Sequence, residues 1–146
     1  MSLRFIFQRN VLRALLAIVA IGSLVRAAEL MPPALYEVTT ETGMPHLEEN
    51  LRYSTTHETR CFAHQDLSAA FPVLEHASFK GCRLDEQKPT DDVISYLLIC
   101  EGKQGTTGEA VWELAKHRIM GTLHVKLGGK NMTFYQRVTA TPLGPC

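Results

Sequence analysis

The side chains that could do chemistry in this sequence are six histidines, four cysteines and several adjacent carboxylates. His57, Cys61 and His64 have the close spacing of a metal site, in which imidazole and thiolate ligands would hold an ion such as Zn²⁺. Cys61 offers no thiolate once it forms a disulfide, so we expect surface histidines beside a cystine. His117 and His124 have an odd spacing, which puts them on opposite faces of a strand. We therefore expect no metal site and no cofactor.

Adjacent carboxylates occur at residues 48–49, 85–86 and 91–92, all in expected loops. Acid/base catalysis needs two carboxyl groups held at a set separation in a cleft, which neighbours in a solvated loop do not provide. The sequence also lacks a Gly-x-Ser-x-Gly elbow, a Walker phosphate loop and a dinucleotide-binding glycine turn. We expect no enzyme activity. The alternative is a metal-handling or hydrolytic envelope enzyme that uses the histidines named above.

The first residues have the pattern of an export signal. Arg4, Arg9 and Arg13 precede an uncharged run at 14–25, whose 12 residues suit a signal-peptide core. That run is shorter than the ~20 residues of a membrane-spanning helix. We expect cleavage after Ala27, which leaves one domain at 28–146 and no stable membrane span. An uncleaved amphipathic anchor is the alternative.

Export gives the cysteines a structural role. The sequence has an even number of cysteines and no C-x-x-C motif, so two disulfides are expected in an oxidising compartment. The cysteines are Cys61, Cys82, Cys100 and Cys146. Four cysteines allow three pairings. We favour Cys82 with Cys100, because their segments are strand-like neighbours, and Cys61 with Cys146, which would tie down the C-terminus.

The composition limits the classes of protein that this chain can be. The 146 residues are 45% hydrophobic and 21% charged, which describes one folded domain and excludes a disordered or collagen-like chain. Removal of residues 1–27 takes away four arginines and leaves 11 basic against 15 acidic side chains, a net charge of −4. A mildly acidic domain lacks the basic face that neutralises phosphates, so we expect no nucleic-acid partner.

Most of the mature chain alternates apolar and polar residues with the period of a β-strand. The alternation predicts strands over residues 35–42, 51–60, 92–101, 108–115, 118–127 and 131–140, with a weaker one over 77–84. Gly121 would be a bend or bulge inside its strand. Residues 64–71 lack β-branched side chains and precede Pro72, which predicts a helix of about two turns. We expect an all-β protein, an antiparallel meander that forms a curled sheet or small barrel with one short helix and two disulfides.

Several motifs lie along the mature chain. They are LYEVTTE at residues 35–41, Gly-Met-Pro at 43–45, Gln-Asp-Leu at 65–67, Cys-Glu-Gly at 100–102 and Leu-Gly-Pro-Cys at 143–146. Together they resemble the bacterial exported domain-of-unknown-function family numbered 3617, over nearly the whole mature chain. The cysteine order and the terminal Leu-Gly-x-Cys are the most specific parts. The resemblance implies a β-rich protein of the Gram-negative periplasm, and it implies no activity.

Five large side chains are candidates for a ligand site. Tyr36, Tyr53, Trp112, Met132 and Phe134 would line a cavity for an apolar ligand if they project from the inner faces of a curled sheet. The alternative is a packed core, since a short chain has few residues to spare for the walls of a pocket. We expect a periplasmic, non-catalytic binding or interaction module of the cell envelope, whose partner is an envelope protein or a small apolar ligand. An inhibitor of a wall-degrading enzyme belongs to the same class.

Overall fold

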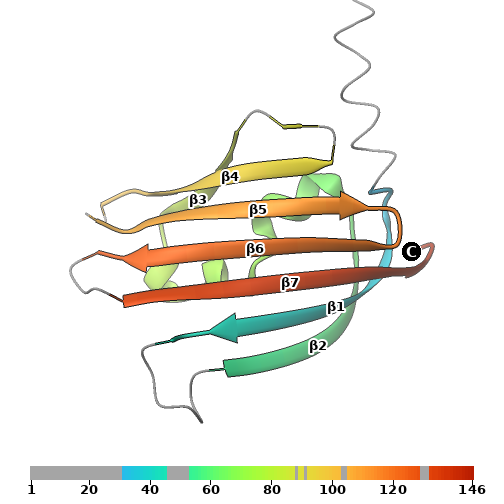
Figure 1. Ribbon diagram of the computed structural model, residues 1–146, viewed down its shortest axis with the longest axis horizontal. Coiled ribbons are helices and arrows are strands. Elements are labelled where there is room, and N and C mark those ends of the chain that lie inside the picture. The colour runs from blue at the N-terminus through green and yellow to red at the C-terminus, as the bar shows by residue number, and fades with distance from the viewer. Residues whose placement is uncertain (1–30, 46–52, 88, 91, 103–104, 129–131) are drawn as a thin grey trace, which may run out of the picture.

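Seven strands form one antiparallel sheet in the computed structural model, which describes residues 31–45, 53–87, 89–90, 92–102, 105–128 and 132–146. The strands are β1 (Ala34–Gly43), β2 (Tyr53–Phe62), β3 (Cys82–Glu86), β4 (Val93–Cys100), β5 (Thr107–Ala115), β6 (Arg118–Leu127) and β7 (Met132–Gly144). Their order across the sheet is β2-β1-β7-β6-β5-β4-β3 (Figure 1). The expected signal peptide lies outside the described residues. Within the described ranges, no helix is long and apolar enough to span a bilayer.

The expected all-β antiparallel fold is confirmed, as a sheet that does not close into a barrel. Strands β3 to β7 follow one another as a meander, and β1 joins this meander by pairing with β7. Strand β2 pairs only with β1, so β2 and β3 are the two edges. Both edges leave one row of backbone groups outside the sheet's hydrogen bonding.

The sheet has one covered face and one open face, as the period-two alternation predicted. Tyr36 and Val38 of β1 and Trp112 of β5 are buried on the covered face, which we call the inner face. Glu37 and Glu113, one residue along from these, lie exposed or half-exposed on the other face, the outer face. The inner face therefore carries the hydrophobic core.

Three short 3-10 helices cover the inner face, lying behind the sheet in Figure 1. They are η1 (His64–Ala69), η2 (Pro72–Glu75) and η3 (Ala77–Phe79). The helix predicted over residues 64–71 is present as η1, a 3-10 helix that ends two residues earlier, and η2 and η3 are short helices that the sequence did not predict. The N–H of Ala70 bonds to the carbonyl of Leu67, three residues back, and Pro72 prevents a longer helix. The strand predicted over 77–84 is wrong in its first half, because Phe79 turns inward as part of this cover and β3 begins only after Gly81.

The two disulfides are the ones favoured from the sequence. Cys82 and Cys100 are direct register partners on β3 and β4. Cys61 is bonded to Cys146. Leu35 of β1 pairs with Cys61 on one side and, on the other, with Gly144, two residues before Cys146. This second bond fixes the C-terminus to the edge strand β2.

Gly121 does not form the expected bulge. The pairings of β6 with β5 and with β7 pass through residue 121 without a shift in register. The glycine is needed for a different reason, because a Cβ atom there would lie 2.6 Å from Cε2 of Trp112. The absence of a side chain lets the indole lie across the strand.

Candidate functional site

Two of the five candidate ligand-binding residues lie in the packed core. Tyr36 and Trp112 are 1% and 0% exposed. The ring of Tyr36 lies 4.8 Å from that of Phe62, and the ring of Trp112 lies 5.2 Å from that of Phe71, measured between centroids. The Tyr36 hydroxyl donates to the carbonyl of Pro32 at 3.1 Å, and burial raises the pKa of this phenol. These two rings fill the interior rather than line a cavity.

Tyr53 lies elsewhere. It is 58% exposed at the start of the edge strand β2, opposite Gly43 on the outer face. The expectation that Tyr53 projects inward is therefore corrected. Residues 53–59 of β2 are exposed on both faces, because no layer of the protein covers this edge. An edge strand of this kind shows period-two alternation in its sequence without burying either face.

Met132 and Phe134 line a groove of about 410 Å³ at one end of the inner face, which we call the rim groove. One wall comes from β1, β6 and β7, and the other comes from η2 and η3. Its apolar lining includes Met44, Val73, Phe79, Leu127, Met132 and Phe134. Phe134 also packs edge-on against Phe79, at 5.8 Å between ring centroids. The groove is therefore a predominantly apolar surface built on fixed aromatic rings.

Gln136 ties the two walls of the rim groove together. Its side chain is 4% exposed, and its Oε1 accepts a hydrogen bond from the Val73 N–H at 3.2 Å. Its Nε2 donates to the Thr42 hydroxyl at 2.9 Å. Since these bonds reach η2 and β1 from β7, they hold the groove's shape without leaving the amide unpaired. The alternation of β7 already places Gln136 on the inner face, yet sequence reasoning missed it because it is polar.

The rim groove also presents hydrogen-bond donors. The Nδ1 of His76 accepts from the Ser78 N–H at 3.1 Å, which assigns the proton of the neutral ring to Nε2. Thr42 accepts from Gln136 and keeps its own O–H as a donor. No described residue of the lining is acidic, and none is lysine or arginine. This chemistry suits a mainly apolar molecule that carries a hydrogen-bond acceptor.

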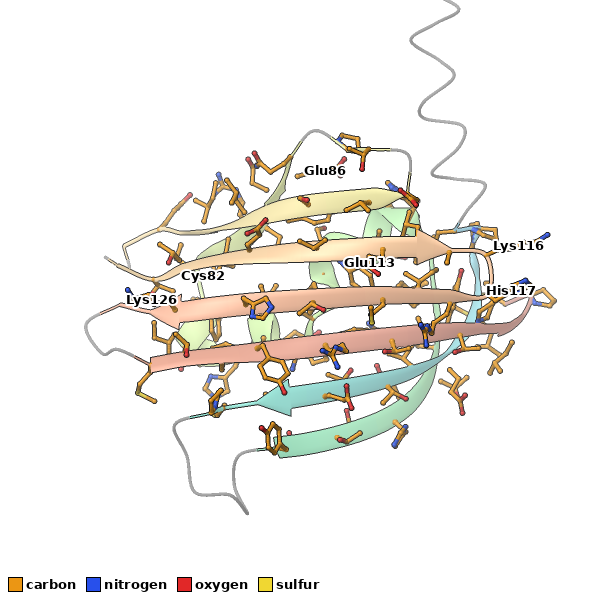
Figure 2. The ribbon with its side chains drawn as sticks, viewed as in Figure 1. Cys82, Glu86, Glu113, Lys116, His117 and Lys126 are labelled. Carbon is orange, nitrogen blue, oxygen red and sulfur yellow. A yellow bond between two sulfur atoms is a disulfide. The ribbon has the colours of Figure 1, made fainter. Side chains whose placement is uncertain are left out.

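The histidines proposed from the sequence lie apart. His57 is hydrogen-bonded through Nδ1 to the Thr39 hydroxyl at 2.9 Å, on the outer face. Cys61 is in a disulfide, and His64 begins η1. His117 lies in the turn between β5 and β6 (Figure 2). His124 lies on β6. In the part of the chain that the structure describes, no three His, Cys, Asp or Glu side chains cluster as a metal site would require.

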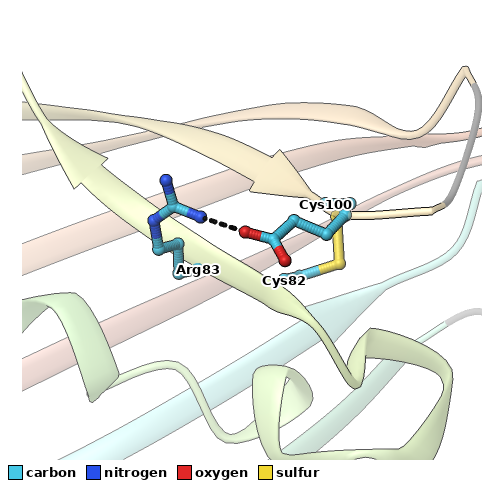
Figure 3. Close-up of polar contacts among 4 residues, drawn as sticks. Cys82, Arg83 and Cys100 are labelled. Carbon is cyan, nitrogen blue, oxygen red and sulfur yellow. Dashed lines mark hydrogen bonds and ion pairs between the residues drawn. A yellow bond between two sulfur atoms is a disulfide. The ribbon is translucent and has the colours of Figure 1, made fainter.

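The carboxylates have structural surroundings. Asp85 and Glu86 lie in β3 rather than in a loop, which corrects the sequence expectation, while residues 48–49 and 91 lie outside the described residues. Glu86 accepts a hydrogen bond from the buried Tyr96 hydroxyl at 3.5 Å. Burial, and after it the Glu86 carboxylate, raises the pKa of Tyr96. Beside the Cys82–Cys100 disulfide, an exposed ion pair joins Arg83 and Glu101 at 3.1 Å (Figure 3), which contributes about 0–1 kcal/mol to stability.

Comparisons of this chain with protein-family models, with curated proteins and with solved structures found no match.

Proposed function

We propose that this protein is a non-catalytic binding module of the cell envelope that holds a small apolar ligand in the rim groove. The observation that carries this proposal is the groove itself, whose volume of about 410 Å³ lies within the range of small-molecule sites. Apolar side chains from both walls supply the contact area, as in most sites of this kind.

The ligand that suits this groove has an apolar body and one polar end that accepts hydrogen bonds. The donors at the groove, His76 and the Thr42 hydroxyl, favour a carbonyl, ether or hydroxyl oxygen. Met44 and Met132 favour a site that adapts to ligands of somewhat different shape, because the unbranched thioether side chain repacks easily.

The periplasm is the proposed location. Residues 1–27 have the charge and hydropathy pattern of a cleaved export signal. Two disulfides with no free cysteine in the described residues support an oxidising compartment. The resemblance to the exported family numbered 3617 agrees with this location.

The first experiment is native mass spectrometry of the protein purified from the periplasm of its own host. A bound organic molecule of discrete mass is the expected result. The denatured mass of the same sample should be that of a chain that begins at Ala28. A second measurement titrates the neutral apolar dye N-phenyl-1-naphthylamine, whose fluorescence rises in apolar sites.

Met132→Trp fills the rim groove and is expected to weaken dye binding at least about tenfold, or ~1.4 kcal/mol. Leu143→Trp adds the same ring at a surface position that is 57% exposed, outside the groove, and is the matched control. Equal dye binding by the two variants would contradict the proposed site, provided that both unfold at the wild-type temperature.

A further inference from the structure

A second surface, on the outer face, has a different chemistry. Strand pairing aligns six residues in one row across the sheet, from β4 to β2. They are Leu97, Glu109, His124, Tyr135, Gly43 and Tyr53, each the register partner of the next. The row places two tyrosines on either side of a glycine. Tyr135 and Tyr53 belong to strands that lie two spacings apart, about 10 Å.

The ring of Tyr135 lies over Gly43, its register partner on β1. A Cβ atom at residue 43 would overlap Cε1 and Cζ of the tyrosine ring. The same arrangement occurs on the inner face, where Trp112 lies across Gly121, but there Phe71 packs on the indole. Among the described residues, the only aromatic ring near Tyr135 is that of His124, at 6.1 Å and tilted by 44°. The half-buried Tyr135 ring therefore rests on the sheet at Gly43, and no aromatic ring of the described residues other than that of His124 packs near it.

Polar side chains surround this ring. A groove of about 630 Å³ runs over β5, β6 and β7 and is lined by Glu109, His124, Lys126 and Tyr135, with Leu97 and Pro45 at its ends. Figure 2 views this outer face and labels Lys126 near the end of β6. Neither Glu109 nor Lys126 has an ion-pair partner within the described residues. The groove thus combines a flat aromatic ring with one carboxylate and one ammonium group.

We propose that this outer groove binds an uncharged oligosaccharide. A sugar ring has a face of C–H groups that stacks on an aromatic ring, and an edge of hydroxyls that both donate and accept hydrogen bonds. Tyr135 supplies the stacking surface, Glu109 accepts from hydroxyls, and Lys126 donates to them. Tyr53, at the end of the same row, provides a second ring for a longer chain. The opposite charges of Glu109 and Lys126 favour a neutral ligand over a polyanion.

The test is a titration of the full, disulfide-bonded chain with cellohexaose and with chitohexaose, followed by backbone amide NMR. Shifts confined to the amides of residues 43, 109, 124 and 135 are expected with at least one of these sugars. Tyr135→Ala should weaken that binding at least about tenfold, or ~1.4 kcal/mol. Tyr53→Ala, at a 58% exposed position, should weaken binding of the hexamer without affecting the fold, and Leu143→Ala, at 57%, should change nothing.

Three results would overturn this proposal. The first is that neither sugar shifts any of these amides at about 10 mM, a concentration well above a millimolar dissociation constant. The second is unchanged affinity in both tyrosine variants. The third is a shift of the same amides with protein concentration alone, which would assign the outer face to a second copy of the chain. Dye binding in the rim groove is measured separately and is not affected by any of these outcomes.

Discussion

The indole of Trp112 lies across Gly121, its register partner on β6, with Cε2 only 2.6 Å from the place that a Cβ atom of residue 121 would occupy. Phe71 packs on the indole at 5.2 Å between centroids. The indole Nε1 is buried and has no hydrogen-bond partner in the described part of the chain. Shape rather than polar bonding therefore holds this ring, which lies at the centre of the inner face.

Gly121→Ala is expected to lower the free energy of unfolding by about 1–3 kcal/mol, because the new methyl group forces the indole out of its position. Chemical denaturation followed by far-UV circular dichroism measures this change, because that signal does not depend on the single tryptophan. In a Trp112→Leu background the same substitution should have a much smaller effect, since the leucine side chain does not reach as far across the strand. Additive effects in the double variant would show that Trp112 is not the reason for the glycine.

Gly121 also shows where sequence reasoning reaches its limit. Period-two alternation correctly placed the buried faces of β1, β5 and β6, because each of these strands has one face in the hydrophobic core. A glycine inside such a strand indicates either a bulge or a close approach by another group. The choice depends on the position of Trp112, which is nine residues away in the chain and opposite in the sheet. Only the pairing of the strands supplies that information.

The rim groove was predictable only in part. Met132 and Phe134 were candidates because they belong to an alternating strand. Val73 and His76 come from η2 and the residue after it, whose positions depend on how this segment crosses the inner face. Tyr53 was misplaced for a related reason, because alternation does not reveal that β2 is an edge strand.

Gln136→Ala is expected to destabilise the fold by about 1–3 kcal/mol, because it leaves the half-buried Val73 N–H without its partner and also removes the bond to the Thr42 hydroxyl. It should also loosen the rim groove and weaken dye binding. Gln87→Ala is the control, since this amide makes one exposed hydrogen bond, to the carbonyl of Asp85 at 3.1 Å. Equal losses of stability in the two variants would show that the bond to Val73 has no special role.

Removal of the disulfide between Cys61 and Cys146, by serine at both positions, should cost about 4.5 kcal/mol by the chain-entropy relation for a separation of 85 residues. Removal of the one between Cys82 and Cys100 should cost about 3 kcal/mol, since its separation is 18. Denaturation curves of the two double-serine variants measure both values. The reverse order would show that the loop-length argument does not govern this fold.

The raised pKa of the Tyr96 phenol leads us to expect a loss of stability at alkaline pH. Its pKa is raised above the usual 10.0 in the folded protein, by burial and then by the Glu86 carboxylate. Below pH 10 both states keep the proton, so the full stability is present. As the pH rises further, the unfolded chain loses this proton first, and stability falls by at most ~1.4 kcal/mol per pH unit for this group. Chemical denaturation at pH 9 to 12 should show a shallower decline for Tyr96→Phe than for the wild type.

Glu86→Gln separates the two causes of this shift. Burial is the largest single cause and remains in this variant, so Glu86→Gln should keep part of the alkaline decline, whereas Tyr96→Phe removes the Tyr96 contribution completely. At pH 8 the phenol is protonated in both the folded and the unfolded state. The difference in the free energy of unfolding between each variant and the wild type at this pH therefore gives the part due to packing and hydrogen bonding, and it is subtracted from the differences at higher pH. A decline in Tyr96→Phe as steep as in the wild type would mean that other groups, such as the buried Tyr36 phenol, dominate the alkaline response.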